Sequence, residues 1–484
     1  MPLFPKSEKQ NTKFEFSESA RCEMILFREI TVADKSLFDR YAYAAQVRDC
    51  DMAFANIYCW QPYYRSEWAV VEGFLVIRFR LDGGERLAYM QPLSRDGLED
   101  FSTIIPQLAG DAFSMGQPLR FAGLTPEGVE VLRRYAPQKF AFAASRDNAD
   151  YIYSAEDLRN LPGRRYQPKR NHINRFRLEN EFRYLPLTAE YAEECLRLNE
   201  LWGAGRADDD ATIATEREAM VRAFENFDAL GLCGGAICVG GELAAFTYGS
   251  QLCEDTFVTH IEKANTKFNG IFATINNLLA QSLPASVKFI NREEDMGIEG
   301  LRKAKLSYYP VAVEPKWVAV EMDKTLQDIK ELWIGCFEDS EAFVEQFLAT
   351  CYDSENLFTH CEQGRVVSMV HLLPFCTAEG ERVDYLYGVA TAPEWRGRGF
   401  ASELILRALR RAEYECRAVV LIPGSENVKR LYESLGFVDR DIQLHFEGEF
   451  DFGTGEKERD KAMILEFGEG ELAARDSLVL KFED

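Results

Sequence analysis

Apolar residues along this chain recur at spacings that change repeatedly between those of helices and those of strands. Over residues 188–202 they recur every three or four positions, which predicts an amphipathic helix. Over 68–79, two apolar runs flank Glu72-Gly73, which predicts a hairpin. The same criteria predict further helices over 98–108, 126–135, 216–227 and 271–283, and further strands over 151–153, 235–239, 242–249 and 256–261.

The last third of the chain begins near Met322 and alternates in the same way. Because helices and strands alternate throughout, we predict an α+β (mixed α/β) protein. We expect a disordered tail over 1–20 and then three similar units, 21–150, 151–321 and 322–484, each a mixed twisted sheet flanked by helices. In the last unit the predicted helices are 326–336, 342–352, 400–414 and 427–435, and the predicted strands are 357–361, 366–374, 383–391, 418–422, 437–446 and 462–467.

Length and composition agree with three globular domains, and the net charge limits the classes of partner that the protein can bind. At about 100–200 residues per domain, the 484 residues correspond to roughly three domains. Hydrophobic residues make up 46% of the chain and charged residues 28%, which is typical of globular proteins. The net charge of −23 opposes extensive binding to nucleic acid or anionic membranes outside a local basic patch. Cationic or neutral small molecules suit this charge better.

Cysteine spacing and hydropathy indicate the compartment. The twelve cysteines include no CxxC pair, and the N-terminal stretch lacks the apolar segment of a signal peptide. The longest aliphatic run, 419–422, is far shorter than the ~20 residues of a membrane-spanning helix. We therefore expect reduced thiols, a cytoplasmic location, no membrane span and no metal. The oligomeric state is left open.

The densest chemistry lies at residues 396–401, R-G-R-G-F-A, where a predicted strand turns into a predicted helix. Glycines let backbone N–H groups converge without Cβ atoms in the way, and a helix N-terminus adds about half a positive charge. A turn of this kind binds a pyrophosphate, and Arg396 and Arg398 add positive charge. The alternative is an arginine-rich loop on the surface.

A second motif follows this turn. After the predicted strand over 418–422 come Pro423, Asn427 and L-Y-E-S-L-G-F at 431–437. From Met322 to the end, the two motifs together resemble those of the GNAT acyl-CoA N-acetyltransferases. The resemblance implies that acetyl-CoA is the acyl donor and that an amine acceptor attacks it directly in a ternary complex. Acceptor pockets are built by variable loops, so these motifs do not identify the acceptor.

The GNAT resemblance assigns binding roles to individual residues. The N–H groups of 396–401 would hold the pyrophosphate, and residues 389–391 would pair with the pantetheine arm like an added strand. Pro423 lacks an N–H, so it would help to end strand pairing and open a wedge for the thioester. The implied cofactor-binding residues are Val389, Ala390, Thr391, Arg396, Gly397, Arg398, Gly399, Phe400, Ala401 and Asn427.

The same resemblance implies catalytic roles. Tyr432 would protonate the leaving thiolate, because ordinary pKa values of about 8.5 for a thiol and about 10 for a phenol are close enough. Helical spacing puts Val428 on the core stripe and Tyr432 at its edge. Asp384 is our candidate for the general base. The alternatives are core packing for Tyr432, a solvated strand-end carboxylate for Asp384, and a satisfied sheet histidine for His371.

Two stretches stand out in the first two units. Residues 164–177, R-R-Y-Q-P-K-R-N-H-I-N-R-F-R, contain no acid, and this basic run predicts contact with a polyanion. The alternative is a solvated helix face that pairs with the chain's own acids. In the stretch 291–310, the carboxylates of residues 293–295 either bind a cation or belong to a turn. The candidate polyanion-binding residues are Arg164, Arg165, Lys169, Arg170, Arg175 and Lys305.

These two stretches, K-R-N-x-I-x-R-F and E-E-D-x-G-I-E-G-L-R-K-A-K-L-S-Y-x-P, resemble an uncharacterised bacterial domain. That domain is related to the C-terminal domain of phosphatidylglycerol lysyltransferase. It would cover residues 22–321 as two GNAT-like units, which makes three GNAT-like units in all. Its relatives transfer an aminoacyl group from charged tRNA, so tRNA is a candidate partner, and Lys305 would contact an anion. The lysyltransferase has a large membrane region that this chain lacks, which argues against a lipid acceptor.

Two enzymatic functions follow from these observations, with a non-enzymatic alternative in which one or both parts sense a ligand or RNA. The leading one is an acetyl-CoA-dependent N-acetyltransferase that acts in the third unit on a small-molecule or aminoacyl amine. The alternative is an aminoacyl-tRNA-dependent aminoacyltransferase in the first two units, with the third unit acetylating the new amine or sensing acyl-CoA.

Overall fold

The computed structural model of this chain describes residues 25–97, 100–203, 210–337, 339–448, 450–452, 461–467, 472–475 and 477–482. The tail predicted over 1–20 lies outside them. Within these residues, the strands form one sheet of twelve strands and one of seven, and helices alternate with strands along the chain. The predicted α+β class is confirmed.

The larger sheet contains the first twelve strands in an order that departs from the order of the sequence. Its helices are α1 (Lys35–Ala45), α2 (Phe54–Cys59), α3 (Gln61–Tyr64), α4 (Ile105–Ser114), α5 (Pro126–Tyr135), α6 (Ala155–Asn160), α7 (Gln167–Glu179), α8 (Ala192–Gly203), α9 (Asp210–Glu225), α10 (Ile271–Ser282) and α11 (Glu299–Leu306). In spatial order its strands are β1 (Arg28–Glu29), β2 (Glu67–Val71), β3 (Phe74–Arg80), β4 (Leu87–Tyr89), β5 (Arg120–Leu124), β12 (Ala312–Glu321), β6 (Phe140–Ser154), β11 (Phe289–Asn291), β10 (Thr256–Ala264), β9 (Glu242–Gln251), β8 (Leu232–Val239) and β7 (Phe182–Pro186).

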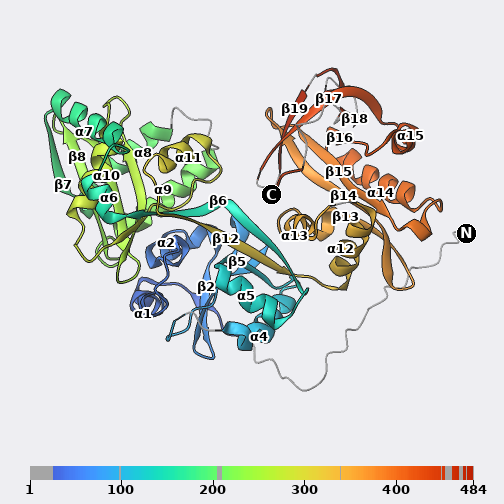
Figure 1. The fold of residues 1–484 in the computed structure, drawn as a ribbon, viewed down its shortest axis with the longest axis horizontal. Coiled ribbons are helices and arrows are strands. Elements are labelled where there is room, and N and C mark those ends of the chain that lie inside the picture. Colours follow the sequence, from blue (N-terminus) through green and yellow to red (C-terminus); the bar gives the residue numbers. More distant parts are fainter. Residues whose placement is uncertain are drawn as a thin grey trace, which may run out of the picture.

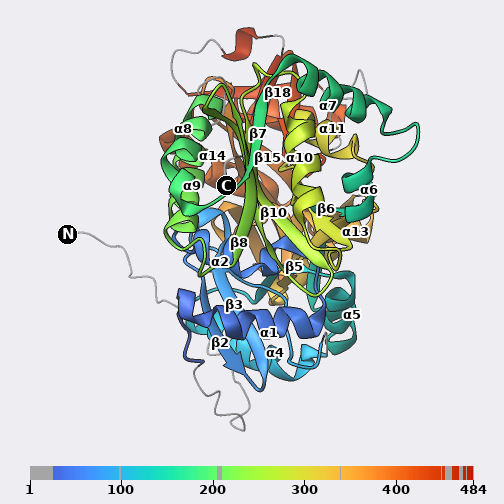
Figure 2. The ribbon, with the colours of Figure 1, turned by 90° about the vertical axis from the view of Figure 1, so that its left-hand side faces the viewer.

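Strands β6 and β12 lie at the centre of this sheet and join its two halves (Figure 1). In Figure 2, strands β2 and β3 of the first half lie below strands β8 and β10 of the second half. The boundary expected at 150/151 falls inside β6, so one strand serves both halves. Strand β12 comes last in the sequence of this sheet but pairs with β5 on one side and β6 on the other. Residues 146–149 bulge out of the β6 ladder, because Ser145 pairs with Lys316 while Asp150 pairs with Glu314.

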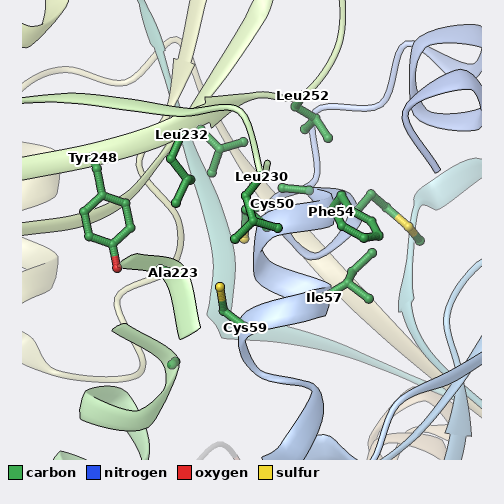
Figure 3. Packing of buried hydrophobic residues seen from close by; sticks show 14 of the residues in the cluster. Cys50, Phe54, Ile57, Cys59, Ala223, Leu230, Leu232, Tyr248 and Leu252 are labelled. Atoms are coloured by element: carbon green, nitrogen blue, oxygen red, sulfur yellow. The ribbon is translucent and has the colours of Figure 1, made fainter. Parts of the chain in front are cut away.

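The two halves also share one hydrophobic core (Figure 3). Phe54 and Ile57 of α2, from the first half, belong to the same buried cluster as Leu232 of β8 and Tyr248 of β9 from the second half. Burial of apolar surface contributes about 25 cal/mol per Å². Because the core is shared, each half needs the other half to bury its apolar residues.

The smaller sheet contains the last seven strands and nearly closes on itself. Strand β14 pairs with β13 and β15, and its end also pairs with β19. The strand order is β13 (Leu357–Glu362), β14 (Arg365–Thr377), β15 (Arg382–Thr391), β16 (Ala418–Leu421), β18 (Lys461–Glu466), β17 (Val438–Glu447) and β19 (Ser477–Phe482). Its helices are α12 (Lys324–Cys336), α13 (Glu341–Thr350), α14 (Phe400–Glu415) and α15 (Glu426–Ser434).

Helices α12 and α13 lie between the two sheets (Figure 1). Ala141 and Ala143 of β6 and Val320 of β12 share a buried cluster with Phe347 of α13 and Leu373 of β14. The small side chains of the two alanines allow a helix to approach the strand closely. The smaller sheet is therefore packed, through these helices, on the central strands of the larger one.

No helix of the described residues is long and apolar enough to cross a membrane. Every cysteine that the structure describes is a free thiol. The predicted helix over 98–108 is displaced toward the C-terminus, because α4 begins at Ile105 with Pro106 in its first turn.

Candidate functional site

The glycine-rich loop before α14 is open to solvent. Residues 396–399 are exposed, and Gly397 and Gly399 have φ values of +75° and +84°. A Cβ atom added at either glycine would meet no heavy atom within 4 Å. Gly399 is the N-cap residue of α14, and no side chain caps this helix. The first N–H groups of a helix have no partner inside it, so this loop presents unpaired donors and a positive helix end to the solvent.

The two arginines of the loop make different contacts. Arg396 Nε donates a hydrogen bond to the Thr391 carbonyl at 3.0 Å, which ties the loop to the end of β15. The Arg398 guanidinium lies 4.4 Å from the centre of the Trp395 ring. Both side chains are exposed. Arg396 therefore also positions the loop. Pyrophosphate binding by residues 396–401 stays a prediction.

A wedge opens between β15 and β16 beside this loop. The two strands pair in parallel at three positions, from Val383↔Ala418 to Tyr385↔Val420. Strand β15 continues to Thr391, held on its other side by β14. Among the described residues, the β16-facing edge of residues 389–391 has no strand partner. Pro423 follows the end of β16. The structure thus places the predicted arm-binding residues at an unpaired strand edge.

The equivalent wedge of the larger sheet is filled. Strands β10 and β11 also pair in parallel at three positions, but the side chains of His260 and Glu293 meet there at 2.9 Å. Gly270 is the N-cap of α10, the helix that follows β10, and a Cβ atom there would lie 2.2 Å from the His172 carbonyl oxygen of α7. The open glycine turn of α14 therefore contrasts with a covered one at α10.

Tyr432 lies deeper than its helical spacing predicts. Tyr432 is 5% exposed and shares a buried cluster with Phe437, Leu404 and Val370. Val428, which was expected in the core, is 37% exposed. The prediction that Tyr432 lies at the edge of the core stripe is wrong, because its ring is buried in the cluster that contains Leu404 of α14 and Leu421 of β16. Burial raises the pKa of Tyr432 to about 12. The hydroxyl therefore stays protonated at neutral pH but is a weaker acid than a free phenol.

Asp384 lies at the start of β15, away from solvent. Its side chain is 0% exposed, Arg382 Nε donates to Oδ1 at 3.1 Å, and Oδ2 has no hydrogen-bond partner among the described residues. Burial raises the pKa of Asp384 even though Arg382 lowers it. The alternative of a solvated strand-end carboxylate is therefore wrong. The base role stays a prediction and requires a relay to the acceptor. The side chain of Asn427 lies outside the described ones.

Most of the basic run contacts the protein itself. Arg165 pairs with Asp157, Arg175 pairs with Glu179, and Arg170 donates to the carbonyls of residues 161 and 163. The Lys169 ammonium lies 3.6 Å from the centre of the Tyr308 ring, and Lys305 is buried with its ammonium on the carbonyls of residues 292 and 294. Arg164 and Arg177 are exposed. Polyanion binding stays a prediction, and these two arginines are the ones best placed for it.

The carboxylates at 293–295 do not converge on one point. Glu293 meets His260, Glu294 Oε2 lies 3.3 Å from the Cys50 sulfur, and Asp295 pairs with Arg302 and Arg146. Each carboxylate therefore has a partner within the chain, which favours the turn over the cation site.

His371 of β14 lies in the core beneath α12. It is 1% exposed, and neither of its ring nitrogens has a hydrogen-bond partner among the described residues. The expectation of a satisfied sheet histidine is therefore wrong. Burial lowers the pKa of His371 to about 3, so the ring is neutral. The ring of Trp333 on α12 lies 5.6 Å from that of His371 and 5.5 Å from that of Tyr387, which makes this face of β15 aromatic.

A buried charge cluster that no sequence motif predicts surrounds Lys316 of β12. Its ammonium lies 2.8 Å from Asp51 and 3.3 Å from both Asp49 and Asp150. The D-C-D triplet at 49–51 is a polar interruption within an apolar stretch, but nothing in the local sequence connects it to a lysine near residue 316. The ligand atoms of Asp49, Cys50 and Asp150 are close enough to hold a metal ion, and the lysine ammonium already lies beside them.

This cluster contains more carboxylates than cations. Glu294 lies 3.9 Å from Lys316 and is a fourth carboxylate of the group. Burial raises the pKa of Asp49 to about 8 and that of Glu294 to about 7, although the lysine lowers both. The folded protein therefore binds protons here that the unfolded chain releases at neutral pH.

Comparison with known proteins assigns the family. A family model described as phosphatidylglycerol lysyltransferase, C-terminal, matches residues 44–320, more than half of the chain. The chain belongs to this family. A second model, described as acetyltransferase (GNAT) domain, matches residues 321–438. The lysyltransferase-like region is thus followed by a GNAT region, as the two resemblances predict. Both models describe transferases, which supports an acyltransferase.

Several solved structures are similar to parts of this chain. A conserved protein of unknown function from Bacteroides thetaiotaomicron is 40% identical, with a TM-score of 0.59, over 62% of this chain and 100% of its own. L-PGS from Bacillus licheniformis is 15% identical, with a TM-score of 0.40, over 54% and 86% of the two chains. The GNAT family N-acetyltransferase YhbS from Escherichia coli, in complex with CoA, is 17% identical, with a TM-score of 0.25, over 34% and 87%. None of the curated proteins matches this chain.

The buried carboxylates predict a fall in stability toward alkaline pH. Because Asp49 and Glu294 have higher pKa values in the folded protein than when unfolded, their contribution is present at low pH. It is lost as the pH rises through 7 to 8. We expect the free energy of unfolding to fall by at least about 1 kcal/mol between pH 6 and pH 9.

Urea unfolding across this pH range measures the effect. Asp49→Asn mimics the protonated acid and should flatten the profile, whereas Asp39→Asn, a half-buried acid paired with Lys35 on α1, should leave it unchanged. A wild-type profile that stays flat from pH 6 to pH 9 would contradict the assignment.

Proposed function

We propose that this protein is an acetyl-CoA-dependent N-acetyltransferase that acts through its GNAT region. The observation that carries the proposal is the open, glycine-capped start of α14 next to the unpaired edge of β15. Unpaired N–H groups at a helix start bind phosphate oxygens, and an unpaired strand edge binds an extended amide-containing arm. Both features lie at one end of the same wedge.

Different residues of this wedge would bind different parts of acetyl-CoA. The N–H groups of residues 396–401 would hold the pyrophosphate, with Arg396 and Arg398 adding charge. The edge of residues 389–391 would hold the pantetheine arm. Acetyl-CoA, as a substrate, supplies an activated acyl group, and an amine takes this group by direct attack in a ternary complex. Gly397 and Gly399 support this assignment. Both have positive φ values, which glycine adopts readily, and the free space at their Cβ positions leaves room for a ligand against the backbone.

Proton transfer is assigned to two buried side chains. Tyr432 stays protonated at neutral pH and belongs to the buried cluster with Leu404 of α14 and Leu386 of β15, so it is the proposed donor of a proton to the departing thiolate. Its raised pKa makes this transfer less favourable than for a free phenol. Asp384 has a raised pKa and an unpartnered oxygen, which suits a base that accepts the amine proton through a relay.

Blocking the glycine turn tests the donor site. Gly399→Glu forces a side chain into the left-handed region and adds a negative charge where the pyrophosphate would lie, so the Kd for acetyl-CoA should rise at least about tenfold. Isothermal calorimetry measures the affinity, and circular dichroism checks folding. Gly380→Glu is the matched control, because Gly380 has φ +80° and free space around its Cβ position at the opposite end of β15. Equal affinities for the two variants would refute the site.

Removing one hydroxyl tests the acid. Tyr432→Phe keeps the ring and its packing, so stability and acetyl-CoA affinity should change little. Loss of the proton donor should lower kcat by roughly 10²–10⁴-fold. Tyr414→Phe, on the exposed side of α14, is the control. A folded Tyr432→Phe variant with wild-type kcat would assign this residue to packing alone.

We propose, as a second candidate function, aminoacyl transfer from charged tRNA in the lysyltransferase-like region. The observation in its favour is the exposure of Arg164 and Arg177, at the two ends of an acid-free run, in a chain of net charge −23. The lysyltransferase family to which the chain belongs agrees with this chemistry.

Charge reversal tests tRNA contact. Arg164→Glu combined with Arg177→Glu should weaken tRNA binding and reduce the slope of log Kd against log salt by about two units, because each phosphate contact contributes nearly one. Arg40→Glu combined with Arg133→Glu changes the same charge on exposed residues of the first half. Filter binding at several salt concentrations measures the slope. If wild-type protein binds tRNA without salt dependence, the run is a structural helix face.

A further inference from the structure

A cavity lies at the boundary between the lysyltransferase-like region and the GNAT region. Its volume is about 430 Å³, which is within the range of small-molecule sites. Arg86, from the loop before β4, lines it on the side of the larger sheet. The end of α13, the start of β15 and the last turns of α14 line it on the side of the GNAT region. A ligand in this cavity would therefore contact both regions at once.

The cavity opens to solvent, and its carboxylates lie at the opening. Asp353, Glu355 and Glu415 line the cavity and are all exposed. The arginines that line it are half-buried, and the side chain of Arg411 is 24% exposed against 39% for that of Glu415. Guanidinium groups therefore lie deeper in the cavity than the carboxylates, and a ligand can reach both from solvent.

The two arginines of the GNAT wall are held in fixed positions. Arg411 donates hydrogen bonds to the Asn356 side-chain oxygen at 2.9 Å and to the Glu355 carbonyl. Glu415 lies between the two arginines, 3.3 Å from Arg382 and 3.5 Å from Arg411. Because these contacts order the side chains before a ligand arrives, binding would cost less conformational entropy.

A buried arginine lies behind Arg86. Arg120 of β5 is 6% exposed, and it donates a hydrogen bond at 3.4 Å to the carbonyl of Leu87, the residue after Arg86. Its Nε has no hydrogen-bond partner among the described residues. Burial lowers the pKa of Arg120 to about 10, to which the charge of Arg86 adds, whereas Asp353 opposes the shift. A negative charge placed against Arg86 would offset this repulsion between two cations.

We propose that this cavity binds a free α-amino acid with an apolar side chain. Among the described residues, three guanidinium groups and three carboxylates line it, so their charges cancel, and a zwitterion matches this pattern better than a polyanion or a polycation. The carboxylate of the ligand lies against Arg86, where a guanidinium can bind it in a bidentate manner. Its ammonium lies against Glu355 at the opening. Its side chain packs on Pro374 and Phe482.

The cavity is separate from the proposed acetyl-CoA site. It lies at the start of β15, where Arg382 lines it, whereas the proposed arm-binding edge begins at Val389. At about 3.3 Å per strand residue, these two positions are about 23 Å apart. An amino acid in the cavity is therefore not the acceptor of the proposed reaction but an effector that links the two regions. The site does not depend on the proposed function.

Calorimetry on the full chain without acetyl-CoA tests the site. L-Phenylalanine and L-leucine should bind, and saturating L-phenylalanine should raise the Tm. Two analogues each lack one charge: 2-phenylethylamine has no carboxylate and 3-phenylpropanoate has no ammonium. Both should bind at least about tenfold more weakly than L-phenylalanine, as should spermidine and citrate. Binding of any of these four as tight as that of L-phenylalanine would overturn the zwitterion assignment. Absence of binding by both amino acids refutes the site.

Variants separate the two ends of the cavity. Arg86→Gln and Glu355→Gln should each weaken L-phenylalanine binding at least about tenfold. Arg40→Gln and Glu413→Gln remove the same charges from exposed residues that do not line the cavity and should have no effect. Circular dichroism checks folding. Wild-type affinity for L-phenylalanine in folded Arg86→Gln and Glu355→Gln variants would place the amino acid elsewhere and refute the site.

The same variants distinguish this site from the acetyl-CoA site. Neither Arg86 nor Glu355 belongs to the glycine loop or the β15 edge, so the Kd for acetyl-CoA should stay at its wild-type value in both variants. Amino-acid binding without acetyl-CoA binding would support the cavity and refute the proposed function. Acetyl-CoA binding without amino-acid binding would do the reverse.

Discussion

The antiparallel pairing of β6 with β12 is the interaction on which the rest of the structure depends. It joins segments far apart in the sequence, and nine residue pairs connect the two strands. Side chains alternate across the pair. Phe140 and Phe142 face the core beneath α4 and α5, and Ala141 and Ala143 face α13. The two halves of the larger sheet meet at this pair, and the GNAT region packs on its other side.

The same pair creates the cluster around Lys316. Bulging of residues 146–149 out of β6 places Asp150 near the ammonium of Lys316, and Asp49 approaches from the first half. Burial of these charges costs solvation energy that one lysine cannot fully offset, so protons take the place of further cations. Removal of the lysine would leave several carboxylates buried together. The centre of the sheet is therefore held by a polar group that tolerates little change.

The larger and the smaller sheet each contain a wedge between two parallel strands, and only one of the two wedges is filled by side chains. Parallel pairs β10–β11 and β15–β16 both separate after three positions. In the first, His260 and Glu293 meet in the gap, and α7 covers the start of α10. In the second, the loop at Gly399 is left open, and aromatic side chains line the neighbouring face. The fold provides the gap, and the side chains decide whether it is filled from within or offered to a ligand.

The sequence by itself determined what depends on neighbouring residues: the helix and strand periodicities, the glycine turn at 396–401, the two family resemblances and the α+β class. Only the tertiary structure decided what depends on distant ones. The sequence predicts a strand only over 151–153, because residues 145–148 are polar. Strand β6 is longer, since β12 pairs with it from Phe140 to Ile152. Periodicity on α15 favoured Val428 as the core residue, but the packing of α14 buried Tyr432 instead. No local pattern connects His371 to Trp333, or Asp49 to Lys316. Spacing along a chain shows which residues share a face, whereas long-range strand pairing decides which faces meet.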